Sequence, residues 1–348
     1  MHLMDSERYV RSLEKVFCEG LEGKTVVITG GTGMIGSCLV DALAVFNRKA
    51  SKPCRVVVTS RRRESAEKRF AYCWDAPWFC YIQQDVCDEA VGWPEKVDYI
   101  LHAASNADPV SFAKAPVDTL MANVLGTDRL LKEGLARGMT RFLYVSSGEM
   151  YGQPDADFND FVEDYCGPID HGNPRACYPA GKRAAEVLCQ SYIAQHGTDC
   201  VIVRPCHVFG PTMTGGDSRA VSEFLRNAAA GKNLGMKSAG LLERSHCYVV
   251  DAADAVFRVL LRGETGNAYN IADPACKMTI RDFALTAAKA GGCQVVFENP
   301  SDLELKGYGK ISRQVLSAHK LQTLGWVGQQ NGSDPIGETV KILREVMQ

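Results

Sequence analysis

Short apolar runs alternate with amphipathic stretches over the first 205 residues of this 348-residue chain. The runs are continuously apolar and rich in β-branched residues, as in strands buried on both faces, whereas the stretches between them carry apolar side chains at helical spacing. This alternation predicts an α/β domain with a parallel sheet between two layers of helices. The predicted strands lie at residues 25–29, 55–59, 79–83, 97–102, 141–146 and 200–203. The predicted helices lie at residues 35–46, 64–72, 120–135 and 178–196.

The pattern differs at both ends of the chain. Residues 5–20 alternate charged and apolar side chains, which predicts a short leading helix. Beyond residue 205, helical stretches are separated by glycine-rich loops and short strands, as in a smaller α+β domain. We therefore expect a helical extension at 1–22, a sheet domain at 23–205 to which 244–262 return, and a second domain at 206–348. Its predicted elements are helices at 219–230, 252–261, 280–290 and 335–347 and a strand at 268–271.

Composition and charge narrow the class of protein. With 46% apolar and 23% charged residues the chain can bury a core, and its formal charge of -2 argues against nucleic acid as the main partner. The longest uncharged run, between Lys24 and Asp41, has 16 residues and four glycines, which predicts no membrane span. The first 24 residues show no signal-peptide pattern, and the 14 cysteines form no C-x-x-C pair. We therefore expect a cytoplasmic protein with reduced thiols and no metal site.

A glycine-rich segment connects the first predicted strand to the first amphipathic helix. Gly30, Gly33 and Gly36 follow the spacing G-x-x-G-x-x-G. Between a strand and a helix, such glycines permit a tight turn, let backbone N–H groups approach a pyrophosphate and allow close packing of the helix on the strand. The N-terminus of the helix adds the positive end of its dipole. The segment predicts a dinucleotide site in a Rossmann-type, doubly wound sheet.

The end of the second strand bears on the choice of dinucleotide. A carboxylate there would bond the ribose 2′-hydroxyl of NAD. This strand instead ends in Ser60 and three arginines beginning with Arg61, and the first acid is Glu64. Guanidinium groups suit the 2′-phosphate of NADP, but they also suit a solvated helix start or stacking on adenine. The charges alone leave NAD and NADP open.

A tyrosine and a lysine stand four residues apart at the start of a predicted helix. Tyr178 and Lys182 therefore share one helix face, downstream of Ser147 at the end of an apolar strand. A phenol of pKa ~10 is a weak base at neutral pH, and burial raises its pKa further. An ammonium ~4 Å away, at an effective dielectric of ~20, offsets this by roughly 4 kcal/mol, about three pKa units. The pair predicts proton transfer coupled to hydride transfer, with Ser147 sharing the proton.

Further motifs accompany these residues. They are His102-Ala-Ala-Ser105, Asn123-x-x-Gly-Thr127, Ser146-Ser-x-Glu-x-Tyr-Gly152, Arg204-Pro and Ser317-Ala-His-Lys-Leu-x-x-Leu-Gly-Trp326. With the glycine segment and the Tyr-Lys pair, they resemble the extended short-chain dehydrogenase/reductase family of sugar-nucleotide epimerases, dehydratases and decarboxylases. The resemblance runs from about residue 24 to the end.

This resemblance implies a Rossmann domain that carries a small sugar-nucleotide domain, a tightly held NAD, and homodimers packed through helices near 117–136 and 180–195. It implies cofactor contacts from Gly30, Thr32, Gly33, Met34, Ile35, Gly36, Ser60, Arg61, Asp85, Val86, Ala103, Ala104, Ser105, Asn123, Tyr178, Lys182 and Pro205. It implies contacts with a nucleoside-diphosphate sugar from Arg175, His207, Arg219, Arg244 and Tyr248. His207 has two alternatives, titration near about pH 6.5 and simple packing. His102 is expected to be a satisfied core residue.

The segments 173–183 and 210–219 most resemble the UDP-glucuronate decarboxylases. Such enzymes first oxidise the C4 hydroxyl of the sugar, and the 4-ketone then allows decarboxylation, dehydration or epimerisation. The resemblance implies a catalytic role for Glu149, which epimerases of this kind usually lack. Dehydratases place Asp directly before that Glu, where this chain has Gly148. Decarboxylation of a UDP-hexuronate is therefore the favoured reaction.

Some residues depart from the family pattern. Cys206 and His207 follow Arg204-Pro where the family has Phe and Asn, and Pro179-Ala180 replaces an acidic pair common in decarboxylases. The alternatives that stay open are 4-epimerisation, 4,6-dehydration and an NADPH-dependent keto-sugar reductase. A dinucleotide-binding scaffold without turnover is a further alternative, although such a protein has no need of Ser147, Tyr178 and Lys182.

Overall fold

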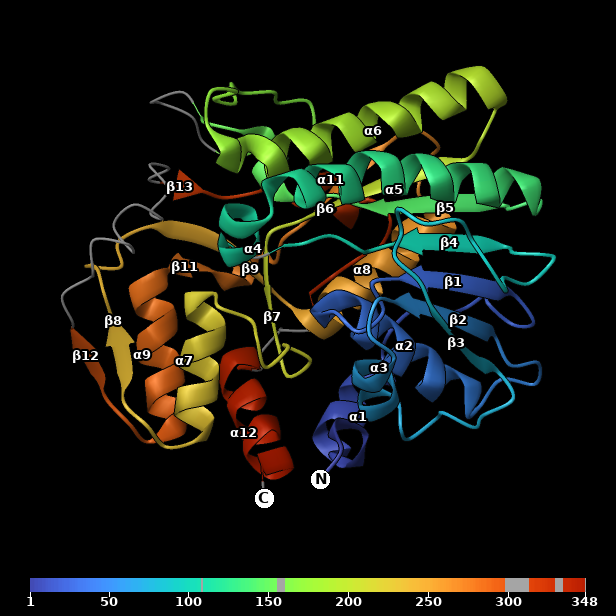
Figure 1. Ribbon diagram of the computed structural model, residues 1–348. Coiled ribbons are helices and arrows are strands. Elements are labelled where there is room, and N and C mark those ends of the chain that lie inside the picture. Colours follow the sequence, from blue (N-terminus) through green and yellow to red (C-terminus); the bar gives the residue numbers. More distant parts are fainter. Residues whose placement is uncertain (108, 155–159, 298–312, 329–333, 348) are drawn as a thin grey trace.

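A seven-stranded parallel sheet forms the larger part of the molecule (Figure 1). The computed structural model describes residues 1–107, 109–154, 160–297, 313–328 and 334–347. The strands are, in spatial order, β10 (Ala268–Ile271), β6 (Cys200–Pro205), β5 (Arg141–Val145), β4 (Tyr99–His102), β1 (Thr25–Thr29), β2 (Arg55–Ser60) and β3 (Phe79–Gln83). Strand order reverses between β1 and β4, so the turns after these two strands diverge at one edge and leave a crevice there.

Helices cover both faces of this sheet. On one face, Val26 and Ile28 of β1 share a core with α2 (Met34–Asn47) and α8 (Val249–Arg262). On the other face, Val27 lies in a core that includes side chains of the two longest described helices. These helices, α5 (Pro116–Ala136) and α6 (Cys177–His196), pack along each other. Because neighbouring side chains of β1 enter opposite cores, its continuous apolar run is explained.

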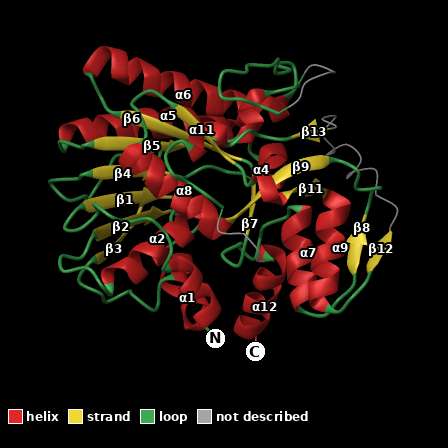
Figure 2. Ribbon diagram, turned by 180° about the vertical axis from the view of Figure 1, so that it is seen from behind, coloured by secondary structure: helices red, strands yellow, loops and turns green. Residues whose placement is uncertain are grey.

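The second part of the chain is smaller and mixed (Figure 2). Its larger sheet contains β11 (Lys277–Thr279), β9 (Glu243–Tyr248), β13 (Arg313–Gln314) and β7 (His207–Phe209), and its smaller one contains β8 (Leu234–Met236) and β12 (Val295–Phe297). Three helices pack together in it, α7 (Ala220–Ala229), α9 (Ile280–Gly291) and α12 (Pro335–Met347). The remaining short helices are η1 (Leu3–Asp5), α1 (Glu7–Leu13), α3 (Arg63–Arg69), α4 (Pro109–Lys114), η2 (Gly148–Tyr151), η3 (Pro174–Ala176), η4 (Pro274–Cys276) and α11 (His319–Gln322).

The predicted α/β class, with a Rossmann-type parallel sheet, is confirmed. The predicted strands at 25–29, 79–83 and 268–271 have the observed bounds. The leading helix is shorter than expected, since α1 spans only Glu7–Leu13. The Ser6 hydroxyl accepts the Tyr9 N–H at its start, and Glu14 is the residue at its C-terminal end. All fourteen cysteines are free thiols. Within the described ranges, no helix is long and apolar enough to cross a membrane.

The chain returns from the second part to the large sheet. The return was expected over 244–262, but β9 pairs in the smaller part, whereas α8 packs on α2 and β10 pairs with β6. We therefore propose that the returning segment consists of α8 and β10. β9 ends at Tyr248 and α8 begins at Val249 with no loop between them, which is why the boundary is not visible as a break in the sequence.

A buried ion pair fixes α6 on the sheet. Arg204 of β6 donates from Nε and Nη2 to the two carboxylate oxygens of Glu186 at 3.0 and 2.7 Å, and both side chains are 9% exposed. Nη1 of Arg204 also donates to the Tyr151 hydroxyl at 2.9 Å. Removing one partner of such a buried pair would leave the other charge uncompensated and would destabilise the folded protein.

Replacing Glu186 by Ala leaves the Arg204 guanidinium without its carboxylate. We expect the free energy of unfolding to fall by about 3–5 kcal/mol in urea titrations. The matched control is Lys132→Ala, because Lys132 also pairs with a carboxylate, that of Asp128, but is 67% exposed. The control should lose less than about 1 kcal/mol. Equal losses in the two variants would contradict the structural role of the buried pair.

Candidate active site

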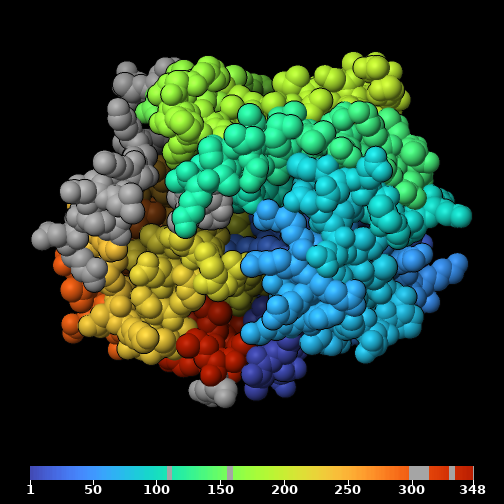
Figure 3. Space-filling model, viewed as in Figure 1, coloured from blue at the N-terminus to red at the C-terminus, as the bar shows by residue number. Residues whose placement is uncertain are grey.

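A cavity of about 1030 Å³ lies where the two parts of the chain meet. Figure 3 shows a hollow between the blue and cyan surface of the sheet domain and the yellow surface of the second part. One wall is formed by the carboxyl ends of β1, β2, β4, β5 and β6 and by the turns that follow them. Residues 211–217 belong to the wall contributed by the second part. Parallel α/β sheets bind ligands at this edge.

The turn after β1 leaves no room for side chains. A Cβ at Gly30 would lie 2.6 Å from the Ala104 Cα, and one at Gly36 would lie 2.5 Å from the Gly30 carbonyl oxygen. Gly30 also has a φ of 66°, which favours glycine. Gly33 precedes α2 without a side-chain cap, and the first residues of α2 line the cavity. This arrangement presents the helix N-terminus to the cavity, as binding of a pyrophosphate requires.

Polar groups farther along the cavity also fit a dinucleotide. The hydroxyls of Ser105 and Ser146 are buried, line the cavity and have no hydrogen-bond partner among the residues that the structure describes. Buried hydroxyls normally have a partner, so a ligand is the expected one. The predicted cofactor residues that line the cavity are Gly30, Thr32, Gly33, Met34, Ile35, Gly36, Ser60, Arg61, Asp85, Val86, Ala103, Ala104, Ser105, Tyr178, Lys182 and Pro205.

Asn123 is the predicted cofactor residue that does not line the cavity. It is fully buried in α5, where its amide donates to the Thr119 carbonyl at 2.8 Å. Its side-chain oxygen accepts a hydrogen bond from the Tyr144 hydroxyl of β5 at 3.1 Å. Asn123 therefore connects α5 to the sheet.

The cavity end near β2 is basic. Arg61, Arg62 and Lys68 line it, and Arg61 donates to the Asn106 side-chain oxygen at 3.2 Å. Glu64, the first acid after β2, does not line the cavity. Among the described residues that line this end of the cavity, Asp85, two residues after β3, supplies a carboxylate.

Tyr178 lies at the start of α6 with its ring 6% exposed. Burial raises the pKa of its phenol to about 12, and the Glu149 carboxylate acts in the same direction, while a hydrogen bond with Ser147 opposes the shift. One aromatic neighbour is Phe112 of α4, whose ring stacks on Tyr178 with centroids 4.6 Å apart and an interplanar angle of 24°. The phenol is therefore held in place, but it is a weak base without an added positive charge.

Lys182 supplies a cation next to that phenol. Its Nζ donates to the Val145 carbonyl at 2.7 Å and lies 5.6 Å from the centroid of the Tyr178 ring. Burial lowers the pKa of Lys182 to about 7, against a smaller opposite effect of Glu186. The amine thus loses its proton far more readily than an exposed lysine, so the two groups of the predicted pair have pKa values shifted in opposite directions.

The other two predicted catalytic residues come from the turn after β5. The Ser147 Oγ accepts the Glu149 N–H at 3.1 Å, which starts η2 and holds both residues at the cavity wall. Arg175 donates from Nη1 to the Glu149 carboxylate at 3.0 Å. Its guanidinium carbon also lies 5.4 Å from the centroid of Phe112. Ser147, Glu149, Tyr178 and Lys182 are therefore brought together as expected, with Arg175 directly behind Glu149.

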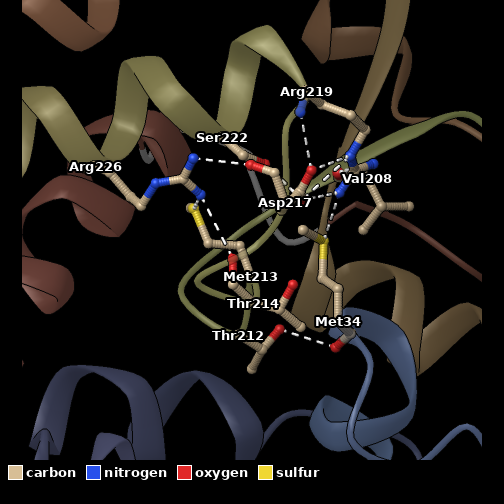
Figure 4. A network of polar contacts seen from close by, with 9 residues as sticks. All are labelled: Met34, Val208, Thr212, Met213, Thr214, Asp217, Arg219, Ser222 and Arg226. Atoms are coloured by element: carbon tan, nitrogen blue, oxygen red, sulfur yellow. Dashed lines mark hydrogen bonds and ion pairs between the residues drawn. The ribbon is translucent and has the colours of Figure 1, made fainter. Parts of the chain in front are cut away.

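Residues 211–219 close the opposite wall (Figure 4). The Thr212 hydroxyl donates to the Met34 carbonyl at 2.9 Å, which connects this loop to the first residue of α2. Arg219 lines the cavity and donates from Nε and Nη2 to the Asp217 carboxylate at 2.9 and 2.6 Å. A carboxylate partner orients the guanidinium, which still has donors for an anion.

The remaining predicted substrate residues differ in position. His207 lines the cavity, but burial, with the cations of Arg244 and Arg219 and the neighbouring His246, lowers its pKa well below 6.5. Titration of His207 near pH 6.5 is therefore wrong. Arg244 and Tyr248 of β9 do not line the cavity, and the Tyr248 ring packs 6.1 Å from that of Phe209.

His102 is a core residue, as predicted, with 1% of its surface exposed. Its Nδ1 hydrogen-bonds the Thr29 hydroxyl at 2.8 Å, whereas its Nε2 has no partner in the described part of the chain. Burial lowers the pKa of His102 to about 3, so the ring is neutral at physiological pH. It is thus only partly satisfied by hydrogen bonds.

Phe112 and the loop residues Thr212 and Met213 belong to the site but were not predicted from the sequence. Phe112 lies in a short helix whose pattern shows no functional motif, and only packing brings its ring onto Tyr178. Thr212 and Met213 line the cavity from the segment that follows β7. Both residues lie in the segment 210–219, which resembles the UDP-glucuronate decarboxylases and contains Arg219, so this resemblance could have identified them.

Comparisons with known proteins agree with this geometry. The sequence model of the "NAD dependent epimerase/dehydratase family" matches residues 26–272. UDP-glucuronic acid decarboxylase 3 of Arabidopsis thaliana is 35% identical over 259 residues, which cover 74% of this chain and 71% of the plant protein. UDP-glucuronic acid decarboxylase 1 of Xenopus tropicalis is 31% identical over 259 residues, which cover 74% of this chain and 58% of that protein.

Solved structures show the same fold. A dTDP-glucose 4,6-dehydratase from Streptomyces venezuelae has a TM-score of 0.76 at 24% identity and covers 92% of this chain and 97% of its own. A UDP-glucuronic acid 4-epimerase from Bacillus cereus has a TM-score of 0.75 at 20% identity, and the match covers 92% of this chain and 99% of the epimerase chain. The resemblance to extended short-chain dehydrogenases/reductases and the expected dependence on NAD are confirmed by the family match. The chain belongs to the NAD-dependent epimerase/dehydratase family.

Proposed function

We propose that this enzyme decarboxylates a UDP-hexuronate through transient oxidation of the sugar at C4. The observation that carries the proposal is Glu149, which lies in the cavity with Tyr178 and Lys182 and is preceded by Gly148 rather than an acid. The relatives that are 31–35% identical and named UDP-glucuronic acid decarboxylases support the same reaction.

The residues that line the cavity fit NAD. The glycine turn after β1 and the start of α2 would hold its pyrophosphate, and Ser60, Asp85 and Val86 would contact its adenosine. Bound at this site, NAD supplies a reversible hydride acceptor. A reaction that returns the hydride to the sugar would consume no cofactor.

Tyr178 removes the proton of the C4 hydroxyl, and Ser147 shares that proton. The phenol with a pKa of about 12 must become more acidic for this step, and the ammonium form of Lys182 favours the phenolate. Because the pKa of Lys182 is lowered to about 7, anything that adds negative charge near Nζ favours the ammonium form. The bond to the Val145 carbonyl keeps Nζ close to the Tyr178 ring.

The ketone formed at C4 lies β to the C6 carboxylate. Carbon dioxide leaves when the C5–C6 bond breaks and its electron pair moves toward the ketone oxygen, and C5 is then protonated. We assign the transfer of that proton to Glu149, which lines the cavity with Tyr178. Elimination of a C6 hydroxyl would need a second acid, and Gly148 cannot supply one.

Arg175 and Arg219 are the cations that we assign to the anionic substrate. Each already contacts a carboxylate, that of Glu149 or Asp217, and each is partly exposed at 44% or 28% of its side chain. A planar guanidinium can bond a second anion with its remaining N–H groups. Neither Arg175 nor Arg244 is among the described residues that line the cavity, but Arg175 contacts Glu149, which does line it. Arg244 is 9% exposed, so we assign it a supporting position beside His207.

We also propose a cytoplasmic homodimer that forms through α5 and α6. These helices pack along each other, and large apolar side chains on their outer faces are exposed. They are Val117, Met121 and Leu135 of α5 and Val187 of α6. Fourteen free thiols suit a reducing compartment.

The product of UDP-glucuronate tests the proposed reaction. We expect mass spectrometry to show a UDP-pentose and release of carbon dioxide, with no net reduction of NAD. A UDP-hexuronate of unchanged mass without carbon dioxide would instead identify a 4-epimerase. A 4-keto-6-deoxy product from UDP-glucose would identify a dehydratase, and consumption of NADPH with a keto-sugar would identify a reductase.

Replacing Tyr178 by Phe removes the hydroxyl that takes the proton. We expect turnover of UDP-glucuronate to fall by about 100-fold or more, while NAD binding is retained, because general acid–base catalysis contributes at least this factor. The matched control is Tyr192→Phe on the same helix, where the hydroxyl donates to Asp128 outside the cavity. Near-normal turnover of the Tyr178 variant would contradict the assignment.

Replacing Lys182 by Met tests the cost of burying the amine. Burial lowers the pKa of Lys182 from 10.5 to about 7, so between these values the unfolded chain binds more protons than the folded protein. The parent protein therefore loses stability relative to the variant as the pH falls from about 10 to about 7. We expect that relative change to be a few kcal/mol, since one pKa unit is worth ~1.4 kcal/mol. Urea unfolding of the ligand-free proteins measures it, and a pH-independent difference would contradict it.

A further inference from the structure

The first three residues line the same cavity as the predicted cofactor site. Met1, His2 and Leu3 belong to the cavity wall, together with Arg69 of α3 and Val346 of α12. Met1, His2 and Leu3 lie outside residues 26–272, the range that matches the family model. We name residues 1–9 the N-terminal strap.

Tyr9, at one end of the strap, contacts α2, the helix that follows the glycine turn after β1. The Tyr9 hydroxyl donates to the Asp41 carboxylate of α2 at 2.8 Å, and both residues are fully buried. Asp41 also accepts hydrogen bonds from the Tyr72 hydroxyl at 2.7 Å and from Arg69. The strap is thus attached to α2 and to the segment around α3 by a buried carboxylate with three donors.

The strap is also anchored on the other part of the chain. Ser6 and Arg8 donate to the Glu345 carboxylate of α12 at 2.6 and 2.9 Å, and Arg8 pairs with Glu338 at 3.3 Å. Figure 1 shows the blue α1 beside the red α12, with the two ends of the chain next to each other. The strap therefore connects α2 to α12 at the edge of the cavity.

His2 holds the wall between these anchors. Its Nδ1 accepts the Met4 N–H at 3.2 Å, and its Nε2 donates to the Arg69 carbonyl at 2.9 Å. Both contacts fit one neutral tautomer, with the proton on Nε2. The ring also lies 5.0 Å from that of Tyr72, and Leu3 beside it is 9% exposed. The wall is therefore ordered by hydrogen bonds and by buried apolar contacts.

We propose that the N-terminal strap closes the adenosine end of the cavity and retains the dinucleotide. The inference rests on the proposed function. Tyr178 and Lys182 mark the nicotinamide end, whereas Ser60 at the end of β2 marks the adenosine end, and the strap and Arg69 line the cavity with them. An enzyme that returns the hydride to its substrate does not exchange its cofactor in each turnover, so a closed adenosine end does not slow the reaction.

The double substitution Ser6→Ala, Arg8→Ala tests the strap. It releases α12 without touching the glycine turn, Tyr178 or Lys182. We expect NAD to dissociate from the holoenzyme about tenfold faster or more, which corresponds to about 1.4 kcal/mol. Glu345→Gln should act in the same direction, and its effect should add only in part to that of Arg8→Ala, because the two substitutions share the contact between Arg8 and Glu345.

Arg11→Ala is the matched control. Arg11 pairs only with Glu7 of its own helix among the described residues, and its side chain is 76% exposed. It should leave the dissociation rate of NAD unchanged. If NAD leaves the double variant and the parent at the same rate, the retaining role is refuted, even where the melting temperature falls. If the parent protein binds no NAD, the proposed function itself fails.

Discussion

The close approach of two backbone turns is the constraint on which the site depends. The turn after β1 passes so near the turn after β4 that a Cβ at Gly30 would collide with Ala104. Because strand order reverses between β1 and β4, the helices that follow these strands lie on opposite faces of the sheet, and the start of α2 faces the crevice between them. The same sheet also positions the predicted catalytic residues. Ser147 follows β5, and Tyr178 and Lys182 lie in α6, which packs on the sheet.

Burial decides the chemistry of the Tyr-Lys pair. In water a phenol and an ammonium are both protonated at pH 7. Here burial raises the pKa of Tyr178 to about 12 and lowers that of Lys182 to about 7, so each group is displaced toward its neutral form. Phe112 stacks on the phenol and the Val145 carbonyl binds the amine, which keeps the two groups at a defined separation. Local charge then controls which of them carries the proton.

Two sets of contacts connect the two parts of the molecule around the cavity, and a buried ion pair holds α6 on the sheet of the larger part. Thr212 bonds the start of α2, the N-terminal strap joins α2 to α12, and Arg204 with Glu186 holds α6 on β6. None of these contacts involves the predicted catalytic residues. They determine how firmly the walls are held, and the proposed retention of NAD is a consequence of the second set.

The sequence by itself determined the α/β class, the strands of the sheet, the phosphate turn and the Tyr-Lys pair. These features are local: a buried parallel strand needs a continuous apolar run, a turn without room for a Cβ needs glycine, and a spacing of four residues places two side chains on one helix face. Only the tertiary structure decided that Asn123 supports α5, that Tyr248 lies outside the cavity and that His207 stays neutral. It also decided that Phe112 and residues 1–3 reach the site. These outcomes depend on burial and on contacts between segments far apart in the chain, and no local pattern encodes them.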